Sequence, residues 1–104
     1  MNRIEKNVDG SFAVLGKLDS SIAEELGSAL DRELDNGQND IQLDLSKVEY
    51  LSSFGLREMI RIHKRMTRNI ANSKGLIIIN PSEQVEQVLY LAGLDTIFEV
   101  AYRK

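Results

Sequence analysis

Cysteine and tryptophan are absent from this 104-residue chain, and proline and histidine each occur once. Without cysteine the chain cannot form disulfides, iron–sulfur centres, cysteine-ligated zinc or a catalytic thiolate. The one histidine, His63, cannot by itself build a multi-histidine metal site, so we expect no metal and no other cofactor. The longest aliphatic run, Leu76-Ile77-Ile78-Ile79, is far shorter than the ~20 apolar residues of a membrane helix.

The rest of the composition is that of an ordinary globular protein. Hydrophobic residues make up 42% of the chain and charged residues 28%, and a chain of this length can bury a core of its own. Residues 1–6 lack the apolar stretch of a signal peptide. We therefore expect a single cytoplasmic domain over residues 1–104, with no membrane insertion.

Charge is distributed unevenly along the chain. The net charge is −3, but residues 1–52 carry −6 and residues 53–104 carry +3. An acidic balance is not typical of nucleic-acid-binding proteins, so we do not expect nucleic acid as a partner. The imbalance between the halves can influence the choice of partner, although it does not determine the fold.

Apolar periodicity predicts alternating strands and helices. The expected order is strand, strand, helix, strand, helix, strand, helix, strand, with the strands over residues 1–8, 11–18, 40–46, 76–79 and 97–102. A connection is expected over residues 47–51, and the β-branched run 76–79 is typical of a central strand covered on both faces. This order predicts an α/β domain with a mixed sheet, in which the opening hairpin at Asp9-Gly10 adds an antiparallel strand.

Polar residues mark the starts of the three helices. In the first helix, Ser21 and Glu24 have the spacing of a capping box. The second begins at Ser52-Ser53, and the third begins at Asn80-Pro81-Ser82, where proline suits the first turn.

The start of the second helix is the most informative place for function. Ser52-Ser53-Phe54-Gly55-Leu56 connects a strand to a helix, where unpaired backbone N–H groups favour an anion by ~0.3–2 kcal/mol. Gly55 would let another backbone or a phosphate approach closely. Serine is a preferred N-cap, so an ordinary cap is the commoner explanation of the two serines taken by themselves. His63 lies two to three turns further along, too far to activate a serine, which argues against a hydrolase.

Three stretches taken together resemble the STAS domain family, in its anti-anti-sigma factor branch, over nearly the whole chain. They are Gly16-Lys17-Leu18-Asp19, then Ile41–Ser46 with Val48-Glu49-Tyr50-Leu51, then Ser52-Ser53-Phe54-Gly55-Leu56-Arg57.

The resemblance implies a regulatory binding protein rather than an enzyme. Members of this branch bind an anti-sigma factor that is also a serine kinase. This binding releases the sigma factor in bacterial transcription regulation. The kinase then phosphorylates a serine at the start of the second helix, the complex dissociates, and a serine phosphatase reverses the modification. We therefore expect an anti-sigma factor antagonist that acts by partner switching, as a monomer or weak dimer.

The serine motif departs from the commonest family form, which is Asp-Ser-Ser-Gly-Leu with the modified serine before the glycine. Alignment on Gly55-Leu56 places Phe54 at that position. A variant form, Ser-Ser-Ala-Gly-Leu, has the spacing found here. The resemblance thus implies phosphorylation on Ser53, with Ser52 as the second candidate.

Several residues have both a structural and a functional interpretation. Asp19 is an N-cap or a partner contact, and Phe54 is a core residue in preference to an exposed anchor. The second helix has a basic row that is either solvated or docks an acidic partner, and Arg57 and Arg61 lie nearest the serines. The expected partner-binding residues are Asp19, Ser52, Ser53, Phe54, Gly55, Arg57 and Arg61.

Two other functions remain open from the sequence. One is a STAS subunit of a transporter complex or signalling scaffold that is not phosphorylated. The other is a module that binds a nucleotide or another small molecule.

Overall fold

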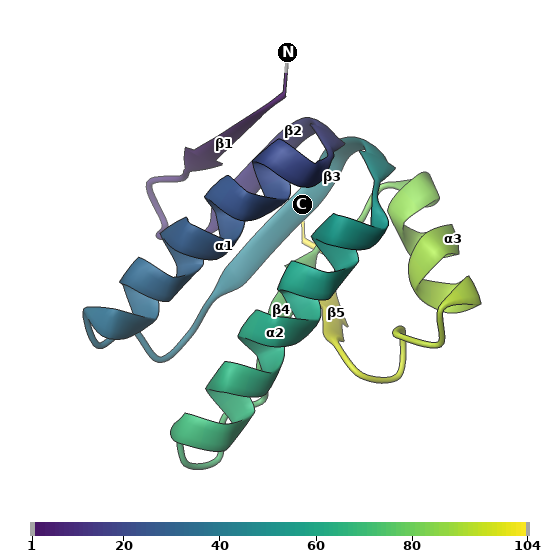
Figure 1. Cartoon of the computed structure of the whole chain (residues 1–104). Helices are drawn as coiled ribbons and strands as arrows, with labels where there is room; N and C mark the ends of the chain where they lie inside the picture. The colour runs from purple at the N-terminus through teal and green to yellow at the C-terminus, as the bar shows by residue number, and fades with distance from the viewer. Residues whose placement is uncertain (1, 104) are drawn as a thin grey trace.

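The computed structural model describes residues 2–103, which form a five-stranded sheet with helices packed against it (Figure 1). In chain order the elements are β1 (Arg3–Lys6), β2 (Phe12–Leu18), α1 (Ser20–Asp35), β3 (Gln42–Leu51), α2 (Ser53–Asn69), β4 (Ile77–Ile79), α3 (Glu83–Leu91) and β5 (Glu99–Ala101). The order of strands and helices is the predicted one. Positions 1 and 104 of the predicted domain lie outside the described residues.

The sheet is mixed, and its strands are arranged in sequence order, β1-β2-β3-β4-β5. β1 is antiparallel to β2, and all other neighbours are parallel. The parallel strands are joined by α1, α2 and α3, as a parallel pair requires a crossover connection. This arrangement confirms the predicted α/β fold with an antiparallel strand at one edge.

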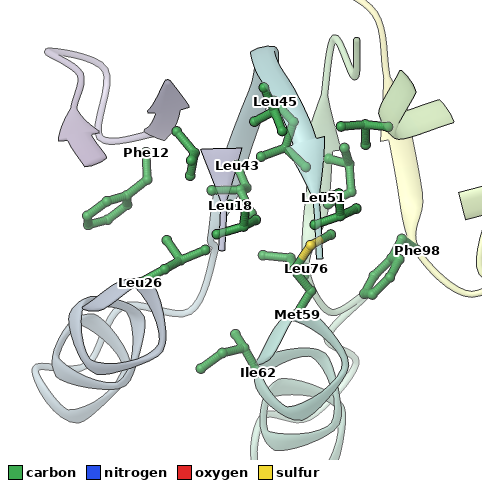
Figure 2. Close-up of a cluster of buried hydrophobic side chains, with 14 of the residues drawn as sticks. Phe12, Leu18, Leu26, Leu43, Leu45, Leu51, Met59, Ile62, Leu76 and Phe98 are labelled. Carbon is green, nitrogen blue, oxygen red and sulfur yellow. The ribbon is translucent and has the colours of Figure 1, made fainter. Parts of the chain in front are cut away.

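One hydrophobic core lies between the sheet and the helices. α1 and α2 lie side by side against one face of the sheet (Figure 1). Figure 2 shows Leu26 of α1 and Met59 and Ile62 of α2 directed toward the sheet residues. The fully buried side chains include Val14, Leu18, Leu26, Leu30, Leu43, Leu45, Met59, Ile62, Met66, Leu76, Ile78 and Leu89.

α3 packs on the same core at the other end of the helical layer. Its N-cap, Ser82, binds β3 through a backbone N–H to the Leu45 carbonyl (3.1 Å) and a hydroxyl to the Val48 carbonyl (2.8 Å). Val85 and Leu89 on its inner face belong to the single core. α3 therefore packs beside the second half of β3, beyond the end of the short β4.

β4 lies between two strands, as predicted for a central strand, but the helices lie on one side of the sheet only. Arg103, beyond β5, donates a hydrogen bond to the Gln42 side chain on β3 (2.7 Å). Since β4 lies between these strands, the Arg103 side chain crosses its outer face. Ile78 and Ile79 point to opposite faces of β4 and are 0% and 5% exposed, so the prediction that both faces of this strand are covered is confirmed at these two positions.

β3 continues through residues 47–51, which the sequence predicts to be a connection. The alternation of inward and outward residues breaks there because the pairing of β2 with β3 shifts register between Ala13 and Leu15 and again between Gly16 and Lys17. Each irregularity displaces the side chains by one position and hides the strand's period of two. The longer strand carries the chain directly to the start of α2.

The N-cap interpretation of Asp19 is confirmed, whereas the capping box at Ser21 and the place of Pro81 in the third helix are not. α1 is capped by Asp19, whose carboxylate accepts from the backbone N–H of Ile22 (3.1 Å), so the helix begins before Ser21. A carboxylate forms a charge-assisted bond at this position, which is stronger than the bond a hydroxyl forms. α3 is capped by Ser82, so Pro81 lies outside the helix rather than in its first turn.

Candidate functional site

Ser52 is the N-cap of α2 and joins the start of this helix to the end of β2. Its Oγ donates to the Leu18 carbonyl (2.6 Å) and accepts from the Gly55 N–H (3.1 Å). The Ser52 N–H also donates to the Leu18 carbonyl (3.1 Å). Because Ser52 is only 7% exposed, its hydroxyl is committed to holding the helix in place.

Ser53 differs from Ser52 both in its position in the helix and in its exposure. It is the first residue of α2, and it is exposed. The backbone therefore presents one serine to the interior and the next to the surface.

Packing against the core requires glycine at position 55. A Cβ at this position would lie 2.7 Å from Leu18 Cγ and 2.9 Å from Leu51 Cδ1. Both leucines belong to the core, so the first turn of α2 lies directly on the ends of β2 and β3. The close approach that the sequence predicts at Gly55 is thus made by core side chains of β2 and β3.

Phe54 lies on the surface beside Ser53, and the preference for a core position is wrong. Its side chain is 51% exposed, and the Arg57 guanidinium lies 5.6 Å from the ring centroid. The buried residues of α2 are Gly55, Met59, Ile62 and Met66. These residues are spaced four, three and four positions apart, so they form one buried stripe that excludes position 54. The sequence shows this pattern only if Gly55 is counted among the buried residues.

Asp19 lies next to the serines because α1 and α2 both start at the carboxyl ends of parallel strands. It follows Leu18, whose carbonyl binds Ser52. Its carboxylate accepts from the Ile22 N–H, the Ser21 hydroxyl and the Asn2 amide. The hydrogen bonds from Ile22 and Ser21 lower the pKa of Asp19, which keeps a negative charge beside the start of α2.

Arg61 and Arg65 face α1 and do not form a free basic surface. Arg61 binds Asp31 (2.8 Å) and Glu58 (2.9 Å), and Arg65 binds Asp31 (2.7 Å) and Asp35. The hydrogen bonds that Arg61 donates to Glu58 and Asp31 raise its pKa above the usual range. The acidic first half of the chain and the basic second half therefore meet between these two helices.

Arg57 is the predicted basic contact that remains available next to Ser53. Its guanidinium rests against the Phe54 ring and forms none of the ion pairs within residues 2–103. The structure thus brings together Asp19, Ser53, Phe54 and Arg57 on one surface, whereas Ser52 and Gly55 lie beneath it.

The Leu18 carbonyl is a part of this site that sequence reasoning missed. It accepts hydrogen bonds from both the hydroxyl and the backbone N–H of Ser52. No side-chain pattern signals a backbone acceptor 34 residues away in the sequence.

Removing the Ser52 hydroxyl is expected to destabilise the fold. Ser52→Ala leaves the buried Gly55 N–H without its acceptor and should cost about 1–2 kcal/mol of unfolding free energy. Ser53→Ala is the matched control, and an exposed substitution of this kind should change the unfolding free energy by less than about 0.5 kcal/mol. Urea titrations of both variants measure the difference, and equal stabilities would contradict the assigned roles.

His63 is a boundary residue of the core, as predicted, and takes part in holding β4. Its Nδ1 accepts from the Leu76 N–H (3.2 Å), and its ring packs edge-on against Phe98, 5.2 Å between centroids. Burial lowers the pKa of His63 below its ordinary value. Protonation would also remove the acceptor that the Leu76 N–H uses.

This environment predicts a stability that depends on pH. Because the pKa of His63 is lower in the folded chain than the unfolded value of 6.5, the unfolded chain binds the proton more readily. The contribution is present above the unfolded pKa and is lost as the pH falls through the folded pKa. When the pH is lowered from about 7.5 to about 5.5, the unfolding free energy should therefore fall more in the parent than in His63→Gln. Equal losses in the two proteins would exclude His63 as the cause.

A metal site and a membrane-spanning helix each set requirements that the described residues can be compared with. Residues 2–103 contain no group of three or more His, Asp or Glu that could hold a metal ion. No helix in the same range is long and apolar enough to cross a membrane. A hollow of about 300 Å³ lies at the opposite end of β2, beside Asp9, Glu33 and Asp40, away from the serines.

A model of the STAS domain family matches residues 3–103, and the chain belongs to this family. BtrV of Bordetella bronchiseptica, named as an anti-sigma factor antagonist, is 33% identical over 96 residues, which cover 90% of this chain and 80% of BtrV. A Thermotoga maritima protein, also named as an anti-sigma factor antagonist, is 39% identical over 71 residues, which cover 67% of this chain and 59% of that protein.

Solved structures agree with this assignment. The crystal structure of an anti-sigma factor antagonist from Thermotoga maritima has a TM-score of 0.75 and 29% identity, and the match covers 99% of this chain and 86% of that one. The anti-sigma factor antagonist SpoIIAA in its unphosphorylated form has a TM-score of 0.72 and 19% identity, covering 97% and 88%. At that identity the second likeness establishes the shared fold alone.

Proposed function

We propose that this chain is a cytoplasmic anti-sigma factor antagonist that binds an anti-sigma factor with serine-kinase activity. The kinase phosphorylates Ser53 and thereby ends the complex, and a serine phosphatase restores the binding form. The chain itself acts by binding and not by catalysis, as a monomer or weak dimer without a cofactor. The similarity to proteins named as anti-sigma factor antagonists supports this function.

The observation that carries the proposal is the contrast between the two serines. A kinase must reach the hydroxyl oxygen, and Ser53 is exposed whereas Ser52 is 7% exposed and bonded on both sides. Beside Ser53 lie a half-exposed aromatic ring and a charge of each sign, in Phe54, Arg57 and Asp19. Aromatic and arginine side chains on a rigid surface are typical anchors of protein interfaces.

The proposed switch is local and electrostatic. In the transfer, Ser53 Oγ forms a bond to the γ-phosphorus of ATP, the bond from that phosphorus to the β–γ bridging oxygen breaks, ADP leaves, and the hydroxyl proton passes to a base on the kinase. The product carries a charge of about −1.5 to −2. The start of α2 tolerates this charge, so the fold need not change. A partner seated on Ser53 would have to bury it, at a cost of several kcal/mol.

Phosphorylation in vitro tests the proposal. The chain is incubated with ATP and each serine-kinase anti-sigma factor of its host, and the site is mapped by mass spectrometry. We expect one phosphate, on Ser53, which Ser53→Ala abolishes. Ser20→Ala is the matched control, because Ser20 is exposed at the corresponding first position of α1 and should not be modified. Absence of phosphate with every kinase would overturn the proposal in favour of an unphosphorylated subunit of a larger assembly.

A further inference from the structure

Arg57 and Phe54 form a contact directly beside Ser53. The guanidinium of Arg57 lies 5.6 Å from the centroid of the Phe54 ring, within the range of a cation–π interaction. Residues four apart on a helix lie on one face, so Ser53 and Arg57 are neighbours as well. Arginine side chains on a helix point toward its N-terminus, which directs Arg57 toward Ser53.

The other arginines in this row are already occupied by carboxylates. Arg61 is held by Asp31 and Glu58, and Arg65 is held by Asp31 and Asp35. The exposed Arg57 has the ring of Phe54 and no carboxylate among the ion pairs of residues 2–103. An exposed cation–π contact stabilises by only about 0.5–1 kcal/mol, so a doubly charged group nearby can displace it.

We propose that Arg57 binds the phosphoryl group on Ser53 and leaves the ring of Phe54 when it does so, so that one modification changes both the charge and the aromatic anchor of the docking surface. This inference rests on the proposed function only in taking Ser53 as the modified residue.

The chemistry of the pair favours this exchange. An anion that precedes a cation by four residues is the favourable orientation on a helix. The planar guanidinium can give two parallel N–H donors to two phosphoryl oxygens, which strengthens the contact beyond a simple charge attraction. Before modification the surface offers a ring covered by a cation. After modification it offers an uncovered ring beside a cluster that is negative overall.

A titration of the phosphorylated chain tests the role of Arg57 without any kinase. Phosphoserine is incorporated at position 53 during translation, and its second ionisation is followed by ³¹P NMR. In the parent chain, Arg57 should hold the pKa of the phosphoserine lower than in Arg57→Gln by about 0.3 pH unit or more. Asp19 and the start of α2 act on the phosphate equally in both chains, so the difference reports Arg57 alone.

Two further variants make the outcome decisive. Arg68→Gln removes an exposed arginine of α2 that forms none of the described ion pairs, and it should leave the phosphoserine pKa at the parent value. Arg57→Lys keeps the charge without the planar donor pair and should fall between the parent and Arg57→Gln. Identical pKa values in the parent, Arg57→Gln and Arg68→Gln would overturn the inference.

The failure of this inference can be told apart from the failure of the proposed function. If no host kinase modifies Ser53 but the ³¹P titration shows the Arg57 effect, the proposed function fails and the contact stands. If a kinase modifies Ser53 and the titration shows no effect of Arg57, the contact fails and the proposed function stands.

Discussion

Ser53→Asp is expected to weaken binding to the serine-kinase anti-sigma factor by about 30-fold or more, while the melting temperature changes by only a few degrees. A carboxylate at the first position of α2 is favourable for the helix itself, because it lies near the positive end of the helix dipole. The same charge should be unfavourable in the complex, because burying a carboxylate against the partner removes its hydration. A cost of about 2 kcal/mol corresponds to this loss of affinity.

Ser53→Asn is the matched control for that result. Asparagine has nearly the shape of aspartate without its charge, so it should bind much more tightly than Ser53→Asp if charge is the cause. Calorimetric titration of the three chains with the kinase measures the affinities, and thermal unfolding measures stability. Binding of Ser53→Asp at the parent's affinity would exclude the electrostatic switch, and equal weakening by both variants would assign the effect to shape.

Gly55→Ala should reduce the unfolding free energy by about 1–3 kcal/mol, the usual cost of overpacking a core. The added methyl would lie within 3 Å of Leu18 and Leu51, side chains that are held on all sides by the core. For a domain of this size each kcal/mol lowers the melting temperature by about 4–8 °C. Because α2 would have to move away from β2 and β3, the hydrogen bonds of Ser52 should weaken as well.

Gly27→Ala provides the contrast on the neighbouring helix. Its methyl would displace the carboxylate end of Glu58, which is flexible, rather than the core. Loss of the Glu58–Arg61 surface pair costs little, and alanine gains about 1 kcal/mol of helix propensity over glycine. We expect a stability equal to or above that of the parent, measured by urea unfolding. A larger loss in Gly27→Ala than in Gly55→Ala would contradict the assigned packing.

Local patterns in the sequence were sufficient for much of the fold. The stripe that begins at Ile22 and the glycine after Asn36 depend on neighbours within one or two turns, and so does the Asp9-Gly10 hairpin. The full length of β3 is harder to predict, because the register shifts in its pairing with β2 break the alternation of its side chains after Ser46. Those shifts arise from pairing with another strand, which a local pattern does not contain.

The sequence by itself determined the order of the elements, the mixed sheet and the presence of two serines at the start of the second helix. Periodicity and capping act over a few residues, so they can be recognised without the fold. The tertiary structure decided that Ser52 faces the Leu18 carbonyl and Ser53 the surface, that Phe54 is exposed, and that Arg61 binds α1 whereas Arg57 stays free beside the serine. Each of these choices depends on contacts between residues far apart in the chain, and only folding brings those residues together.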